Sequence, residues 1–392
     1  MTTNKKNRIP NAPVLRFPEF TEEWVEYKLG DIIEFSKDRV SSSSLNEDNY
    51  VSTENMLQDF QGIVKSQGVP PNINVIAFKR GDILISNIRP YLKKVWKADR
   101  EGGCSADVFV MRANPDFCEE DFLHHIIANE RFISYVMSGA KGVKMPRGDK
   151  EQMKEYKTAL PSKKEQLPIS LLLSLLDERI ISQSRAIEKL QSLISGITQK
   201  VSKHPSVQKT MLSDVLMERN EKNQKLLPVY SVSVSEGIVN QVEYLGRSFA
   251  AKDTSNYNVV YFGDIVYTKS PTGDFPFGIV KRSNNADKVA VSPLYGVYQP
   301  ASEDIGIYLH YYFCSSLNAK NYLHKLIQKG AKNTINITNQ RFLENEVPIP
   351  DPLTLRKYVV LMTSLSKKLE QEKNLLALLQ TQKQFLLQEM FI

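Results

Sequence analysis

The sequence predicts an α+β protein that contains one structural unit twice, each copy a mixed α/β domain followed by a long helix. Three observations lead to this prediction. Short motifs recur in the same order at offsets of 182 to 191 residues. Apolar residues follow a heptad pattern after a proline in each half, and the linker between the halves is short. We therefore expect two domains separated by two long helices, which pair as an antiparallel coiled coil with pseudo-two-fold symmetry.

The recurring motifs locate the two domains. Gly-Asp-Ile at Gly81 returns at Gly263, "FLHHII" at Phe122 returns as "YLHYYF" at Tyr308, and "SGAKG" returns as "KGAKN". We interpret Gly-Asp-Ile as a turn that leads into a buried strand. The predicted segments are an N-terminal tail (1–19), a first domain (20–161), a first helix (162–201), a second domain (202–350, beginning with a linker at 202–208) and a second helix (351–392).

Each predicted helix has the a/d spacing of a coiled coil. After Pro168, and again after Pro352, apolar residues fall at alternating steps of three and four. The polar residues Gln183 and Glu372 interrupt the two patterns at the same register, which indicates that the helices pair with each other. The predicted seam consists of Leu173, Leu176, Ile180, Gln183, Ile187 and Leu190 in the first helix and Met362, Leu365, Leu369, Glu372, Leu376 and Leu379 in the second.

The linker length decides the direction of the pairing. A helix of roughly 30 residues is about 45 Å long, whereas the linker can span at most about 25 Å. The second domain must therefore begin near the far end of the first helix, and the second helix must run back. Because Ser195 and Gly196 are poor in a helix interior, we expect the first helix to fray before its end.

Composition is that of an ordinary soluble protein. A chain of 392 residues, 41% of them hydrophobic and 24% charged, suits two or three domains. The longest apolar run is far shorter than the roughly 20 residues of a membrane span, and the basic N-terminus lacks the apolar core of a secretory signal. We therefore expect a cytoplasmic protein without membrane contact. The net charge of +7 favours a polyanionic partner.

Motifs for catalysis are missing. The sequence has no phosphate-binding loop of the ATPase type, no Asn-Pro-Pro-Tyr or Asn-Pro-Pro-Phe of adenine methyltransferases and no Gly-x-Ser-x-Gly. Cys104, Cys118 and Cys314 have no Cys-x-x-Cys spacing. His124 and His310 coincide across the repeat, but a histidine and its immediate neighbour do not share a helix face. We predict no catalytic residue and no metal site.

With these motifs in this order, the chain resembles the specificity (S) subunits of type I restriction-modification systems. The resemblance rests on the opening "LRFPEFTEEWVEYKLGDII" from Leu15, on Gly-Asp-Ile with a strand-like run behind it, on "GAKG" or "GAKN", and on a proline-marked exit into a heptad helix. No single motif is diagnostic, whereas their order and duplication are. The resemblance covers nearly the whole chain.

The resemblance implies a non-catalytic subunit that recognises double-stranded DNA. Its two globular regions would be target recognition domains, each reading one half of a bipartite, asymmetric site with an unread spacer. Its paired helices would set the distance between the domains and dock two methyltransferase (M) subunits, which are joined by restriction (R) subunits. S-adenosylmethionine, ATP and Mg²⁺ would bind to those partners, with no cofactor on this chain.

Two loops in each domain carry candidate DNA-binding residues. Arginine reads guanine, asparagine reads adenine, aspartate accepts from cytosine, and lysine or serine commonly holds phosphate. A solvated surface loop remains the alternative for any single residue. The candidates are Asn87, Arg89, Tyr91, Lys93 and Lys94 behind the first Gly-Asp-Ile, Lys269, Ser270, Thr272 and Asp274 behind the second, and Lys141, Lys144, Arg147, Lys329, Lys332 and Asn333 in the two glycine-containing basic segments.

Two other functions stay open from the residues alone. Asp116, Glu155 and Lys157 match the short pattern by which nucleases hold Mg²⁺, although the second half has no matching lysine. The helices are also compatible with a coiled-coil scaffold that binds only protein.

Overall fold

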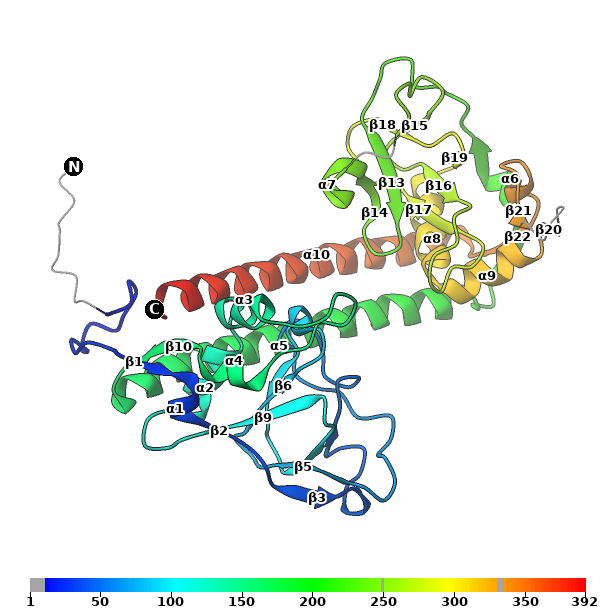
Figure 1. Ribbon diagram of the computed structural model, residues 1–392. Helices are drawn as coiled ribbons and strands as arrows, with labels where there is room; N and C mark the ends of the chain where they lie inside the picture. Colours follow the sequence, from blue (N-terminus) through cyan, green and yellow to red (C-terminus); the bar gives the residue numbers. More distant parts are fainter. Residues whose placement is uncertain (1–10, 248–249, 330–334) are drawn as a thin grey trace, which may run out of the picture. The chain divides into compact units, whose positions relative to one another are not determined.

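The computed structural model describes residues 11–247, 250–329 and 335–392, and it forms two compact units. Unit 1 comprises residues 1–185 and 374–392, and unit 2 comprises residues 186–373. The two long helices are α5 (Lys163–Val201) and α10 (Pro352–Glu389), so each of them contributes one part to each unit (Figure 1). Within the described ranges, no helix has an apolar stretch long enough to span a bilayer.

Unit 1 is built on an antiparallel sheet with the strand order β2-β9-β6-β7. Along β6, Ile83 and Ile85 face a core shared with the helices, and Leu84 faces a core shared with a second sheet, β3-β5-β8-β4. The strands are β1 (Val25–Lys28), β2 (Ile33–Phe35), β3 (Arg39–Ser41), β4 (Tyr50–Val51), β5 (Asn74–Phe78), β6 (Ile83–Ser86), β7 (Val95–Lys97), β8 (Gly102–Cys104), β9 (Val108–Ala113) and β10 (Lys157–Leu160). The helices are α1 (Leu29–Ile32), η1 (Ser42–Ser44), η2 (Pro90–Leu92), α2 (Glu120–Ile127), α3 (Glu130–Ser138) and α4 (Lys150–Lys154).

Unit 2 has a sheet of the same order, β12-β19-β16-β17, again antiparallel throughout. Ile265 and Tyr267 of β16 face the helices, and Val266 faces the second sheet, β14-β13-β18-β15. The strands are β11 (Gln208–Met211), β12 (Leu216–Glu218), β13 (Val229–Ser233), β14 (Gly237–Asn240), β15 (Asn258–Val260), β16 (Ile265–Thr268), β17 (Ile279–Arg282), β18 (Val289–Val291), β19 (Gly296–Pro300), β20 (Gln328–Lys329), β21 (Ile335–Asn336) and β22 (Glu346–Ile349). The helices are α6 (Leu212–Val215), α7 (Gln241–Leu245), α8 (Glu303–Cys314), α9 (Ser316–His324) and η4 (Arg341–Leu343).

The units agree in their closing strands and differ at one sheet edge. The antiparallel pair β1–β10 in unit 1 corresponds to β11–β22 in unit 2. In both second sheets one strand pair is parallel, β4–β8 or β13–β18, and the strand before the Gly-Asp turn lies antiparallel beside it. The fourth strand is β3, next to β5, in unit 1, whereas it is β14, next to β13, in unit 2.

The helix α5 runs through Gly196 to Val201 without the fraying that the sequence predicts. The residues around Gly196 explain the difference, because Ile194 and Thr198 are both buried in unit 2 and the Thr198 hydroxyl lies 2.8 Å from the hydroxyl of Tyr358. A glycine in a helix costs roughly 1 kcal/mol relative to alanine. Packing on both sides of this glycine offsets that cost.

Both long helices contribute to the core of each unit. In unit 1, Leu173 of α5 shares a core with Leu387 of α10, and in unit 2 Ile194 of α5 shares a core with Met362 of α10. Each of the twelve seam residues named from the sequence is buried or half-buried. The apolar stripe therefore faces protein along both helices.

Candidate nucleic-acid interface

The two Gly-Asp-Ile motifs form the same buried turn, as expected from the sequence. Gly81 and Gly263 have φ angles of +92° and +87°, which favour glycine. The carboxylate of Asp82 accepts from the backbone N–H of Lys79 at 2.8 Å, and that of Asp264 accepts from Tyr261 at 2.9 Å. Each aspartate thus closes the turn that leads into β6 or β16, whose residues are all buried.

An arginine neutralises each buried aspartate, but it comes from a different strand in each unit. Asp82 receives two hydrogen bonds from Arg112 of β9, at 2.8 and 2.7 Å. Asp264 receives two from Arg219, which follows β12, at 2.7 and 3.1 Å. Gln299 of β19 holds the position that Arg112 has in β9, and it accepts from Arg219 at 3.2 Å. Sequence reasoning missed both arginines.

In unit 1, the structure joins the two loops that the sequence predicted separately. The N–H of Arg89 donates to the carbonyl of Pro146 at 2.7 Å, and the N–H of Gly148 donates to the carbonyl of Asn87 at 2.8 Å. Lys141 and Arg147 exchange backbone hydrogen bonds at 3.1 and 2.9 Å. The result is one continuous surface, here called the unit 1 basic surface and formed by Arg89, Tyr91, Lys141, Lys144 and Arg147.

All five side chains of the unit 1 basic surface are exposed. Lys141 and Arg147 form exposed ion pairs with Asp149 and Asp107, each at 3.4 Å, which water screens strongly. In the part of the chain that the structure describes, no hydrogen bond or ion pair engages the side chains of Arg89 and Lys144. These cations can therefore bind an incoming anion without breaking a strong internal contact.

The other three candidates of the first loop turn into the protein. Asn87 is buried and its Oδ1 lacks a hydrogen-bond partner. The ammonium of Lys93 pairs with Glu130 and Asp59, and that of Lys94 donates to the carbonyl of Thr53. In this conformation, they hold the loop rather than face solvent.

In unit 2, the loop between β16 and β17 presents its polar residues on a tight turn. Thr272 and Phe275 exchange backbone hydrogen bonds around Gly273, and the buried Phe275 anchors the turn. Ser270, Thr272 and Asp274 are exposed, and Lys269 is half-buried. Of the second basic segment, Lys329 lies in β20, whose side chains are not described, and Lys332 and Asn333 lie outside the described residues.

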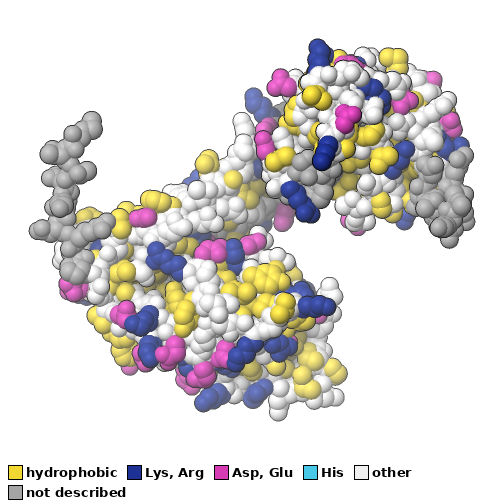
Figure 2. Space-filling model, turned by 45° about the horizontal axis from the view of Figure 1, so that its top comes forward, with side chains coloured by type: hydrophobic (Ala, Val, Ile, Leu, Met, Phe, Trp, Pro, Cys, Tyr) yellow, Lys and Arg dark blue, Asp and Glu magenta, His cyan; other side chains and the backbone are white. Residues whose placement is uncertain are grey.

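Charge by itself does not mark the interface. On the face that Figure 2 shows, lysines and arginines alternate with acidic and apolar side chains instead of forming one uninterrupted patch. The loop geometry, and not the net charge of +7, distinguishes the unit 1 basic surface.

The three residues of the nuclease pattern do not assemble a metal site. Glu155 pairs with Lys28 at 2.7 Å, Lys157 pairs with Glu26 at 2.9 Å, and all three of Asp116, Glu155 and Lys157 are exposed. Across the described ranges, the one group of side chains with metal-ligand spacing consists of His124, His125 and Asp177. We did not predict this group from the sequence, which led us to expect no metal site.

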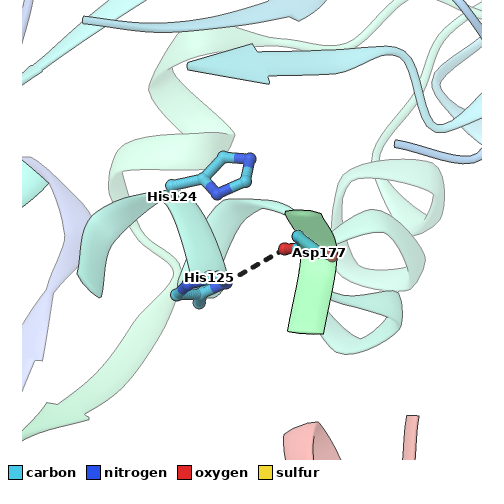
Figure 3. Close-up of side chains that lie close together, drawn as sticks. All are labelled: His124, His125 and Asp177. Carbon is cyan, nitrogen blue, oxygen red and sulfur yellow. Dashed lines mark ion pairs between the residues drawn. The ribbon is translucent and has the colours of Figure 1, made fainter. Parts of the chain in front are cut away.

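The adjacent histidines of that group diverge on α2, and Figure 3 marks a contact with Asp177 of α5 for His125. The ligand atoms of all three residues lie within 4.8 Å of one another. Burial, with Lys383 and Lys97 nearby, lowers the pKa of His124 to about 3. Burial likewise lowers the pKa of His125 well below its usual value. Both imidazoles are therefore neutral near pH 7.

The part of the chain that carries the unit 1 basic surface is similar to a known family of domains. Residues 21–192 match the model described as the type I restriction modification DNA specificity domain. The matched residues include both loops of the unit 1 basic surface and the first part of α5.

One solved structure shares the fold over nearly the whole chain. The S subunit of a type I restriction-modification system from M. genitalium is 16% identical, with a TM-score of 0.60 over 97% of this chain and 99% of that one. The HsdS subunit from Thermoanaerobacter tengcongensis is 17% identical, with 93% and 95% covered and a TM-score of 0.38. A third structure, described by complex assembly and conformational transition of the type I R-M system, is 17% identical, with 93% and 96% covered and a TM-score of 0.48. A search of curated proteins gave no match.

Proposed function

We propose that the chain is the DNA-recognition subunit of a type I restriction-modification enzyme and that it reads a bipartite, asymmetric site. The proposal rests on one observation: the two units share a fold but differ in the residues of one equivalent loop. Both units place a loop directly behind the strand that follows the buried Gly-Asp turn. Unit 1 offers Arg89 and Tyr91 there, and unit 2 offers Thr272 and Asp274.

These loops suit different bases. The exposed guanidinium of Arg89 matches the O6 and N7 acceptors of guanine, and Asp274 can accept from the amino group of cytosine. Lys141, Lys144 and Arg147 would neutralise phosphates next to the first half-site. A repeated scaffold with one cationic and one acidic loop therefore supports two half-sites of different sequence.

The long helices would separate the two domains and bind the partners. In unit 1, Asp177 of α5 pairs with Lys383 of α10, and in unit 2 Thr198 of α5 contacts Tyr358 of α10. Residue numbers thus rise along one helix while they fall along the other, which supports an antiparallel coiled coil.

Equivalent apolar pairs lie exposed near the start of each helix. Leu171 and Leu172 on α5 correspond to Val360 and Leu361 on α10, and the exposed fractions are 61%, 38%, 60% and 44%. Large exposed apolar groups at matching positions are suited to two copies of one partner. We assign these pairs to two methyltransferase (M) subunits, to which restriction (R) subunits add. S-adenosylmethionine, ATP and Mg²⁺ would bind those partners, and this chain would catalyse no step.

A domain exchange tests whether each domain recognises one half-site independently. Residues 208–350 are replaced by those of a homologue with another site, and methylated sites are sequenced after expression with the methyltransferase subunits. One half-site should change while the other and the spacer remain. A change of both half-sites, or of neither, would overturn the proposal. Binding to the partners without salt-sensitive binding to DNA would favour a coiled-coil scaffold.

A further inference from the structure

Two buried side-chain atoms of unit 1, one from His125 and one from Asp177, face each other without a hydrogen-bond partner among the described residues. His125 Nδ1 lies 4.0 Å from Asp177 Oδ2. His125 Nε2 lies 3.3 Å from the hydroxyl of Ser174. When Nε2–H donates to that hydroxyl, Nδ1 presents a lone pair to the carboxylate. This arrangement calls for an electrophile in the gap.

The surrounding groups hold both ligands as metal sites do. Lys383 of α10 binds the other carboxylate oxygen, Asp177 Oδ1, at 2.5 Å and leaves Oδ2 toward the histidines. Ser174 fixes the ring of His125 in the same way. Metal-binding imidazoles and carboxylates are usually held by such a second partner on the atom that faces away from the ion.

Unit 2 shows that the fold does not need these charges. At the positions that correspond to His125 and Asp177, Tyr311 and Ser366 join their hydroxyls directly. The counterpart of Lys383 in the repeat is Ile194, which is buried. At equivalent positions, unit 2 therefore has a neutral, hydrogen-bonded pair of hydroxyls, whereas unit 1 has a histidine and an aspartate that do not bond to each other.

We propose that His124, His125 and Asp177 form a binding site for a divalent transition-metal ion, with Zn²⁺ as the best-suited ion. Two imidazoles and a carboxylate are ligands that zinc prefers, and a fourth position is left for water. The three ligand atoms lie within 4.8 Å of one another. Tetrahedral bonds of about 2.1 Å place ligand atoms about 3.4 Å apart, so the side chains must close inward by up to about 1.4 Å. The ion would tie α2 to α5.

The test is metal uptake by the full chain, which is independent of DNA recognition. Chelator-treated protein is titrated with Co²⁺, followed by visible absorption, and then with Zn²⁺, followed by the melting temperature. We expect one Co²⁺ per chain, displaced by Zn²⁺, and a melting temperature that rises and saturates near one equivalent.

The matched variant is H125Y/D177S/K383I, which copies the three residues that unit 2 has at the equivalent positions. It should stay folded and lose the Co²⁺ spectrum, whereas H204A, which removes a histidine outside the site, should keep it. No uptake by the wild type, or equal uptake by H125Y/D177S/K383I, would overturn the site. Either result would leave the proposed DNA recognition untouched.

Discussion

Arg219 holds the buried carboxylate of Asp264 through two hydrogen bonds, although the arginine with that role in unit 1, Arg112, stands on the neighbouring strand. The pairing register of the strands shows that the arginine has changed its position between the two units. In unit 1, β9 carries Arg112, whereas Gln299 holds that place in β19. The carboxylate closes the turn in both units. An arginine neutralises it in each unit, but the arginine comes from a different position in the sheet.

Removal of Arg219 should destabilise unit 2. The variant R219M leaves the Asp264 carboxylate buried without its cation, and burial already raises the pKa of Asp264 against the effect of Arg219. Breaking a buried pair costs about 3–5 kcal/mol, and the partial exposure of Arg219 reduces this to about 2–3 kcal/mol. Urea unfolding of the full chain measures the loss.

A second variant tests whether the position of the arginine matters. R219S/Q299R places the guanidinium on β19, as Arg112 is placed on β9, and should recover most of the stability. If R219M melts like the wild type, or the double variant recovers nothing, the ion pair does not hold the turn.

The exposed cations of the unit 1 basic surface should contribute separately to DNA binding. R89A should lower affinity by about 1–3 kcal/mol and relax the preference at one base of one half-site. K144A should weaken binding to all sequences and reduce the slope of log K against log salt by about one. Titration of the assembled methyltransferase with duplex DNA measures both.

Lys93 is the matched control for this surface. Its ammonium already pairs with Glu130 and Asp59, so K93A should change DNA binding less than K144A. A loss with K93A equal to that with K144A, or relaxed reading of the other half-site by R89A, would contradict the assignment of these residues.

Local sequence patterns predicted the helices and turns, whereas side-chain pairing depends on contacts between residues that are distant in the sequence. The heptad spacing located seam residues such as Leu173 and Met362, which are fully buried, because helical periodicity is written in the sequence itself. The turn at Gly81 was predictable for the same reason. The pairing of Asp82 with Arg112 was not, because the two strands meet only in the folded sheet.

The direction of the loop side chains could not be predicted from the sequence either. Asn87 and Lys94 look like DNA-binding residues in sequence, but the first is buried and the second donates to Thr53. A pattern of residue types does not tell which cations a neighbouring carbonyl or carboxylate has already engaged. Arg89 is distinguished only by the approach of Pro146 to its backbone, which fixes the loop with the side chain outward.

Cys314 should be the reactive thiol of the chain. Burial alone would raise its pKa, but His310 and Lys281, whose ammonium lies 3.4 Å from the sulfur, bring the pKa down to about 6. Burial raises the pKa of Cys104 and Cys118 to about 12. The thiolate is the nucleophile, so alkylation of Cys314 should increase through pH 6 and level off near pH 7.

Peptide mass spectrometry after brief iodoacetamide treatment resolves the three cysteines. In K281M, the pH midpoint for Cys314 should move upward because a cation that favours the thiolate is lost. Labelling of Cys104 at the same rate, or an unchanged midpoint in K281M, would contradict the role of Lys281.

Two glycines should respond in opposite directions to replacement by alanine. At Gly196 of α5, a Cβ would have no atom within 4 Å and φ is not positive, so G196A should stabilise the chain by about 0.5–1 kcal/mol. At Gly81, φ is +92°, a backbone conformation that L side chains rarely adopt, so G81A should destabilise unit 1 by more than that. Thermal unfolding of both variants compares the two sites within one chain. A destabilised G196A would show that α5 needs flexibility where its packing indicates a regular helix.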